Sequence, residues 1–150
     1  MGSLNLIVIL LNFLEGRKMS DDFSYEQSSL QAFYFIEEVL INGTPIELDD
    51  WVAAFNGDVC VGSRQWGDKL EGFGNTRFNG VPVMGNDGNK LTAGGIEKPI
   101  MEGYMKPGDT PTFKIFDSSE GIYYDAIPSA VYPWKIYGIH WVSLKTIDNN

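Results

Sequence analysis

The chain has 150 residues, of which 43% are hydrophobic, 13% aromatic and 21% charged, with 17 glycines and 7 prolines. This length fits one globular domain with a sizeable core, and the many turn residues favour short strands over helices. The net charge of −9 disfavours nucleic acid as a partner, because contacts to phosphates need a basic surface.

The first 18 residues form an apolar N-terminal segment. Its apolar run is roughly a dozen residues long, too short to span a bilayer as a helix, so no transmembrane span is predicted. Arg17 and Lys18 follow the run instead of preceding it, which is not the pattern of an ordinary signal peptide. Two interpretations remain open: either Met19 is the natural start, or residues 1–18 serve as an assembly or anchor segment. Residues 19–150 are predicted to form a single β-sandwich domain.

Two Asn-Gly pairs each separate short runs of apolar residues. They are Asn42-Gly43 and Asn56-Gly57, and the second lies in the middle of the stretch from Asp49 to Trp66. Asn-Gly between such runs is the strongest short-range signal for a β-hairpin with a type I′ turn. The sequence therefore predicts a hairpin at each pair.

The hairpin around Asn56-Gly57 alternates in a way that assigns its faces. In the run WVAAF, Trp51, Ala53 and Phe55 are predicted to point to one side, with the intervening Val52 and Ala54 on the other. Ala53, Ala54, Gly62 and Ser63 are small, which favours the close approach of another backbone. The pattern is typical of the packed centre of a sheet.

The rest of the chain divides into a glycine-rich connection and a strand-rich end. Gly67–Gly103 is predicted to be one long, largely irregular loop. After it, Pro107-Gly108 fits a type II turn, and strands are predicted at Pro111–Phe116, Ile122–Ile127 and Lys135–Ile147. The last strand alternates, with Val142 and Leu144 expected on the side of His140 and with Ile139 and Trp141 on the other side. This spacing favours an all-β fold, an antiparallel β-sandwich of the jelly-roll or immunoglobulin-like kind.

Catalytic signatures are lacking. With Cys60 and His140 each alone of its kind, neither an internal disulfide nor a zinc cluster of His and Cys can be assembled, and both residues are interpreted as structural. No nucleophile elbow or phosphate-binding loop is present. We therefore expect no enzyme; a small glycan-active enzyme with two converging carboxylates is the remaining catalytic alternative.

No cofactor is predicted, although a structural calcium ion stays an open alternative. Gly85–Asn89 (GNDGN) and Asp117–Gly121 (DSSEG) offer the oxygen ligands that calcium accepts. Neither stretch has the spacing of an EF-hand loop, and turn chemistry alone accounts for both.

Four aromatic residues lie beside turn residues and outside clean alternation: Trp66, Tyr104, Tyr132 and Trp134. Planar rings at such places stack on sugar rings or anchor a protein partner. The alternative is that they close the ends of the sandwich. These four are the predicted ligand-binding residues.

Three stretches carry a resemblance to a known module: LDDWVAAFNGDVCVGSRQW, VPVMGNDG and GYMKPGDTPTFKIFD. They resemble a β-sandwich surface or adhesion module of secreted bacterial surface proteins and of fibre-like proteins of marine phages. The resemblance covers Phe23 to Asp125, about two thirds of the chain, although such modules are usually embedded in longer chains.

The resemblance implies an adhesive, carbohydrate-binding or structural role. We expect a non-enzymatic domain on a virion surface, a phage fibre or decoration protein, whose partners are other copies of itself or virion proteins. The alternative is a carbohydrate-binding or adhesion module of a secreted bacterial protein, with a host surface glycan as its ligand. The expected location is accordingly the virion, the cell surface or the extracellular space.

Overall fold

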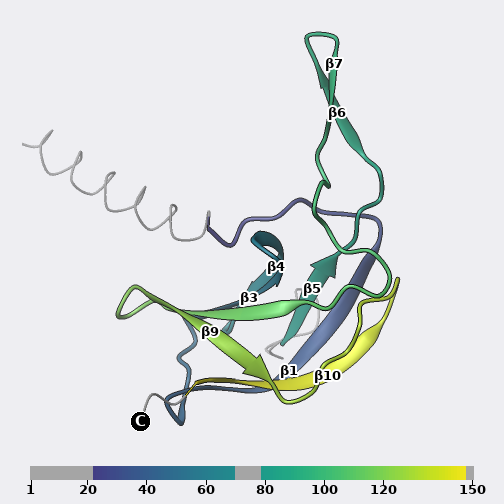
Figure 1. Ribbon diagram of the computed structural model, residues 1–150. Coiled ribbons are helices and arrows are strands. Elements are labelled where there is room, and N and C mark those ends of the chain that lie inside the picture. Colours follow the sequence, from purple (N-terminus) through teal and green to yellow (C-terminus); the bar gives the residue numbers. More distant parts are fainter. Residues whose placement is uncertain (1–21, 70–78, 148–150) are drawn as a thin grey trace, which may run out of the picture.

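The computed structural model describes residues 22–69 and 79–147, and within these ranges it contains ten β-strands and no helix (Figure 1). The strands are β1 (Gln31–Ile41), β2 (Thr44–Pro45), β3 (Trp51–Asn56), β4 (Val59–Gln65), β5 (Gly80–Met84), β6 (Lys90–Ala93), β7 (Ile96–Pro99), β8 (Thr112–Asp117), β9 (Ile122–Pro128) and β10 (Ile139–Thr146). The all-β prediction is confirmed. The apolar N-terminal segment lies outside the described residues.

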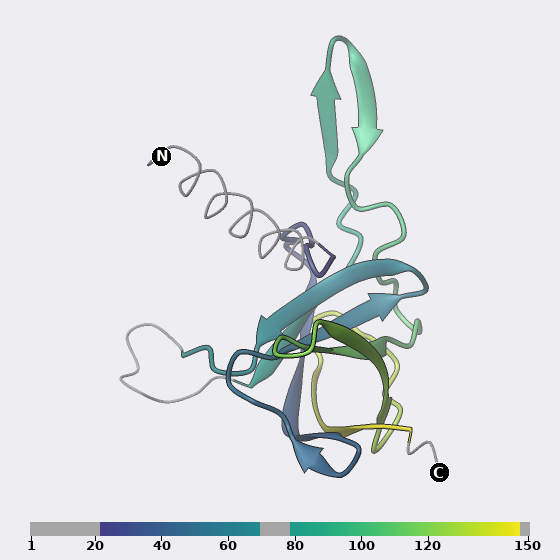
Figure 2. The same cartoon turned by 90° about the vertical axis from the view of Figure 1, so that its left-hand side faces the viewer.

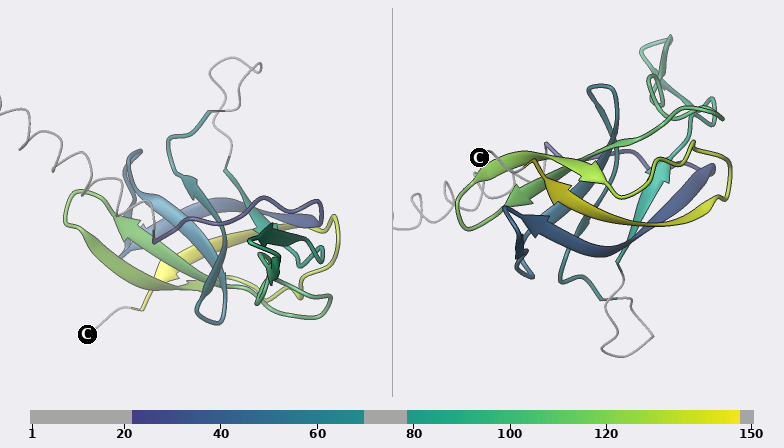
Figure 3. Two further views of the ribbon diagram at one scale, coloured as in Figure 1. Left: turned by 90° about the horizontal axis from the view of Figure 1, so that it is seen from above. Right: turned by 60° about the horizontal axis from the view of Figure 1, so that its bottom comes forward.

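Eight of these strands form a single sheet in the order β2-β1-β10-β9-β8-β3-β4, with β5 paired to β1 as well. β1 and β10 run parallel and side by side, with Phe35 opposite Trp141 (Figure 3, blue and yellow). Every other pairing in the sheet is antiparallel. These eight strands thus form one curled, mixed sheet, and the expected sandwich of two antiparallel sheets is not confirmed. Side-chain alternation assigns faces but not strand direction, which is why the sequence did not reveal the parallel pair.

The sheet curls until its two ends meet at β4 and β5. A Cβ atom added to Gly62 of β4 would lie 1.5 Å from the carbonyl oxygen of Pro82 in β5. Close by, the Nε–H of Arg64 donates a hydrogen bond to the carbonyl oxygen of Gly80 at 3.0 Å. The expected close approach of another backbone at the small residues of this hairpin is therefore confirmed.

The inner side of the curled sheet encloses the main core. Alternate residues of the strands supply it, and the largest side chains buried there are Trp134, Tyr34, Ile36, Met84, Met101, Met105, Ile115 and Leu144. Removing each such apolar side chain from water contributes roughly 1.5–3 kcal/mol. In β10 the predicted faces are confirmed, because Val142 and Leu144 are buried whereas Ile139 and Trp141 are exposed.

A second, smaller cluster lies on the outer side of β3 and β8. Phe23 covers Phe55 and Phe116 there in edge-to-face contacts, with ring centroids 5.9 and 6.4 Å apart. The Ser63 hydroxyl donates a hydrogen bond to the carbonyl oxygen of Phe23 at 2.8 Å. The predicted division of β3 into two faces is confirmed, since Ala53 belongs to this cluster.

The two Asn-Gly turns differ from each other. Asn42 and Gly43 both have positive φ, 48° and 79°, as a type I′ turn requires. At the second pair the predicted hairpin is confirmed, but its turn is not of type I′: Asn56 pairs with Val59, and only Gly57 has positive φ, as in a type II′ turn. Asn56 remains in the strand because its amide donates to the carbonyl oxygen of Gly103 at 3.0 Å, a contact the local sequence does not reveal.

The long irregular loop expected at Gly67–Gly103 contains three of the strands. β5 is buried at every position and pairs with β1, and β6 and β7 form a separate hairpin. A strand buried on both sides shows no alternation, and Pro82 in its centre argued further against a strand. Residues 70–78 of the expected loop lie outside the described residues.

Candidate functional site

Two of the four aromatic residues predicted to bind a ligand belong to the core. Trp134 is almost completely buried, and its indole N–H donates a hydrogen bond to the carbonyl oxygen of Val83 at 2.9 Å. Tyr104 is buried as well, and its hydroxyl oxygen accepts a hydrogen bond from the Glu26 backbone N–H at 2.6 Å. Neither ring presents a face to solvent, so both close the interior, as the alternative interpretation held.

The other two aromatic residues lie closer to solvent. Trp66 is half-buried and packs against the main core. Tyr132 is 38% exposed and stacks on the imidazole of His140, with ring centroids 4.7 Å apart and planes 9° from parallel. The four residues therefore do not converge on one site, and Tyr132 is the member of the set with a substantially exposed ring.

A different group of apolar side chains is exposed or half-buried on the outer side of β10 and its neighbours. We call it the outer apolar face, and it consists of Phe33, Phe35, Leu40, Ile127, Ile139 and Trp141. Ile139 is 54% exposed and Trp141 is 56% exposed. Contiguous apolar surface of this kind marks interaction sites on soluble proteins. The sequence contained a sign of this face, because large apolar residues occur on both alternating sides of β10.

Two aromatic rings of the outer apolar face stack on each other. Phe35 and Trp141 are opposite each other on adjacent strands, with centroids 5.3 Å apart and planes 18° from parallel. This separation is that of an offset stack, so the stacking direction runs across the strands and within the surface of the sheet. One face of the Trp141 indole is thereby covered by Phe35.

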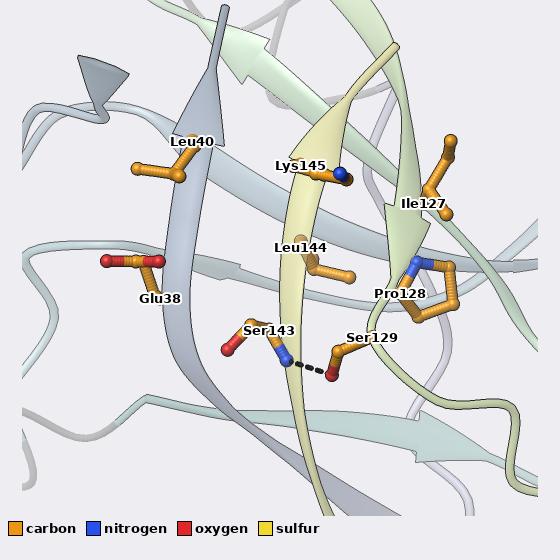
Figure 4. Close-up of a pocket in the computed structure, with 8 residues that line it drawn as sticks. All are labelled: Glu38, Leu40, Ile127, Pro128, Ser129, Ser143, Leu144 and Lys145. Carbon is orange, nitrogen blue, oxygen red and sulfur yellow. Dashed lines mark hydrogen bonds between the residues drawn. The ribbon is translucent and has the colours of Figure 1, made fainter. Parts of the chain in front are cut away.

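A groove continues the outer apolar face towards the C-terminal end of β10 (Figure 4). It has a volume of about 110 Å³ and is lined by Glu38, Leu40, Ile127, Pro128, Ser129, Ser143, Leu144 and Lys145. The backbone N–H of Ser143 donates to the Ser129 hydroxyl at 2.9 Å, which ties β10 to the end of β9. Glu38 and Lys145 are exposed and lie beside the aliphatic residues that line the groove. The chemistry of this groove is that of a receptor for an aliphatic side chain with charged neighbours.

Tyr137 is held in a strained conformation directly before β10. Its φ is 58°, in the left-handed region that costs a residue with a side chain roughly 1–2 kcal/mol. The side chain is nevertheless 70% exposed, while the backbone N–H donates to the carbonyl oxygen of Gln31 at 2.8 Å. Strain of this kind concentrates at functional sites. Tyr137 thus presents a further exposed aromatic ring directly before β10.

Cys60 and His140, the one cysteine and the one histidine of the chain, are both partly buried. Burial raises the pKa of the Cys60 thiol to about 11, so the thiol is protonated at neutral pH. Burial, with a smaller contribution from Lys135, lowers the pKa of His140, whose Nε2 is buried without a hydrogen-bond partner. The imidazole lies between the rings of Tyr34 and Tyr132 rather than beside a carboxylate.

The two stretches considered for calcium are turns whose carboxylates are already hydrogen-bonded. Asp87 accepts hydrogen bonds from the backbone N–H groups of Ser29 and Asn89, each at 3.0 Å, and these lower its pKa. The hydroxyl of Ser119 donates to Asp117 at 2.7 Å and lowers the pKa of that carboxyl. Within residues 22–69 and 79–147, His, Cys, Asp and Glu side chains nowhere gather in threes in a way that would hold a metal ion. The conformations of both stretches follow from turn chemistry.

Comparisons of the chain with family models, with curated proteins and with solved structures each found no match. In the part of the chain that the structure describes, no helix has the length and apolarity needed to cross a membrane.

Proposed function

We infer that the chain is a non-enzymatic structural or binding domain of a virion surface, a phage fibre or decoration protein, that contacts other proteins through its outer apolar face. The exposure of Ile139 and Trp141 on that face is the observation that carries the protein-binding role. The virion setting rests on the resemblance of the Asp49–Trp66 hairpin and its companion stretches to modules of fibre-like proteins.

The geometry of the rings favours protein over carbohydrate as the ligand of this face. A sugar ring stacks on an aromatic ring whose face is open, whereas Phe35 already covers one face of Trp141. Exposed aromatic rings beside aliphatic side chains resemble the centre of a protein interface, where aromatic residues are enriched. Binding through such a surface depends on apolar contact and is therefore insensitive to salt.

Tyr132 and Tyr137 support the second candidate, a carbohydrate-binding or adhesion module. Both rings are exposed beside the start of β10, and Tyr137 is held out at the expense of backbone strain. Tyrosine combines an apolar ring with a hydroxyl that bonds to sugar hydroxyls. A host surface glycan is the ligand in that case.

Site-directed photo-crosslinking in the cells that produce the protein tests the proposal. A photoreactive phenylalanine at position 141 should crosslink to structural virion proteins or to further copies of the chain. The matched control is the same residue at position 122, where Ile122 is similarly exposed, on β9 away from the groove. Equal yields at both positions would contradict a protein-binding role of the face. Glycan-array binding that is lost on Tyr132→Ala would favour the carbohydrate-binding module instead.

A further inference from the structure

The dipeptide Asn-Gly occurs at three places in the chain: Asn42-Gly43, Asn56-Gly57 and Asn79-Gly80. Such a pair is chemically reactive, because glycine has no side chain to hinder its backbone nitrogen from attacking the asparagine side chain before it. The three pairs share this chemistry but lie in different surroundings. The fold therefore determines which of them reacts.

The reaction is deamidation, and water is its co-reactant. The backbone nitrogen of the glycine bonds to Cγ of the asparagine and loses its proton, while the side-chain nitrogen of the asparagine leaves as ammonia. Water then adds to one of the two carbonyl carbons of the cyclic succinimide and breaks its bond to the ring nitrogen. The product is aspartate or isoaspartate, depending on which bond breaks.

Ring closure requires the backbone to open locally. The five-membered ring contains the bond between Cα and C of the asparagine, so the ψ angle must leave the value that it has in a hairpin turn or a strand. The reacting species is thus a locally unfolded state, and its population depends on the free energy of opening. The pair whose surroundings open most easily reacts first.

The β1–β2 hairpin is the least covered of the three places. Figure 2 shows it at the lower end of the molecule, and β2 is the terminal strand of the sheet. This strand has two residues, Thr44 and Pro45, and both are exposed, as are Asn42 and Gly43 in the turn. Pro45 has no N–H to donate to β1. Opening this turn therefore breaks few hydrogen bonds and exposes little apolar surface.

Asn56 is held much more firmly. Its side-chain nitrogen donates to the carbonyl oxygen of Gly103 at 3.0 Å and to the carboxylate of Asp109 at 3.2 Å. β3 lies between β4 and β8, and its central residues are buried on both sides. Gly80 of the third pair begins β5, which is buried at every position. Opening either place requires unpacking of the core.

We propose that Asn42 is the site at which the folded chain deamidates. Isoaspartate there lengthens the main chain by one methylene group, and either product adds a negative charge to a chain of −9. The change falls at the end of β1, two residues after Leu40 of the outer apolar face. Because the reaction is slow and irreversible, the modified fraction increases with the age of the protein. This proposal does not depend on the proposed function.

Thr146 of β10 controls how readily the turn opens. Its side chain is buried, and its Oγ1 accepts a hydrogen bond from the Asn42 backbone N–H at 2.8 Å. The same hydroxyl donates to Oδ1 of Asn42 at 3.4 Å, which is long for such a bond. Both contacts hold Asn42 in the closed turn. Loss of the hydroxyl should therefore speed the reaction at Asn42.

Peptide mapping by tandem mass spectrometry tests the site. The full chain is incubated in warm, mildly alkaline buffer, and the conversion of each asparagine is followed with time. In the folded chain Asn42 should react about tenfold faster than Asn56 or Asn79. In concentrated urea, which removes the fold, the three rates should become similar. Equal rates in the folded chain, or the same ranking in urea, would overturn the proposal.

Two variants of Thr146 test the role of the turn. Thr146→Val removes the hydroxyl and should raise the rate at Asn42 several-fold without changing the rate at Asn56, whereas Thr146→Ser keeps the hydroxyl and should react like the parent chain. Melting temperatures show that both variants are folded. An unchanged rate at Asn42 in Thr146→Val contradicts the opening step. Aspartate formed without isoaspartate would mean direct hydrolysis and would also contradict the proposal.

Discussion

The β3–β4 hairpin and the β6–β7 arm are built alike but are covered differently. Each consists of two short antiparallel strands joined by a two-residue turn with glycine at positive φ. In β3, Val52 and Ala54 face the main core, while Ala53 and Phe55 lie under Phe23 on the other side. The arm is exposed on both sides. The turn residues therefore favour a hairpin in both places. Whether other parts of the chain pack against the hairpin determines if it stabilises the fold or remains exposed to a partner.

Gly62→Val should cause the largest loss of stability, because Gly62 lies in the covered hairpin at the place where β4 contacts β5. The first carbon of any side chain would lie 1.5 Å from the Pro82 carbonyl oxygen, and backbone on both sides leaves no room to shift. We expect the variant to lose cooperative thermal unfolding, as measured by circular dichroism. The control is Thr112→Val, a similar side chain at an exposed strand position. A Gly62→Val chain that melts within a few degrees of its parent would contradict the closure of the sheet at this point.

Truncation of one apolar side chain in each hairpin sharpens the comparison. Val52→Ala removes two methyl groups from a fully buried site, and the free energy of unfolding should fall by about 2 kcal/mol. Leu91→Ala in the arm removes a larger group, yet the free energy of unfolding should change by less than about 0.5 kcal/mol. Urea titration at a concentration where the chain is monomeric measures both. A loss at Leu91 as large as that at Val52 would show that the arm packs on its own body.

Gly57→Val should destabilise the chain by roughly 1–2 kcal/mol. A Cβ atom at Gly57 would meet no neighbour, so the whole effect comes from its φ of 61°, which a β-branched residue adopts poorly. Asp58→Val is the matched control, since Asp58 is the other turn residue and lacks positive φ. Equal melting temperatures for the two variants would remove the assignment of the turn to Gly57-Asp58.

The sequence predicted the elements of the covered hairpin better than those of the arm. Asn42-Gly43, the alternation in β3 and that in β10 are local signals, and each was confirmed. β5 was missed because a strand buried on both sides does not alternate, and the parallel pairing of β1 with β10 depends on residues about a hundred positions apart. The arm was assigned to a loop because its strands are short and rich in polar residues.

The candidate site was harder to predict than the fold. Proximity to glycine and proline singled out Trp134 and Tyr104, but such residues also end strands around a core, and both rings are buried. Ile139 and Trp141 were correctly assigned to the side of β10 opposite His140. What the sequence did not show is that this side is exposed, since exposure depends on which neighbouring segments cover a strand. Only the curled sheet supplies that information.

The ion pair of the arm should have the smallest effect, and it separates local from global stability. Lys90 and Glu97 are both exposed, and an exposed pair of this kind contributes at most about 0.5 kcal/mol, which salt screens further. We expect Lys90→Ala to leave the melting temperature unchanged but to speed hydrogen exchange at the amides of the arm, and 1 M salt should remove this difference. The counterpart is Lys114→Ala, which breaks an exposed pair with Asp125 between β8 and β9 of the main sheet, where the strands stay held by their neighbours. Faster exchange throughout the sheet in Lys90→Ala would mean that the arm unfolds together with the body, and the two hairpins would then be parts of one cooperative unit.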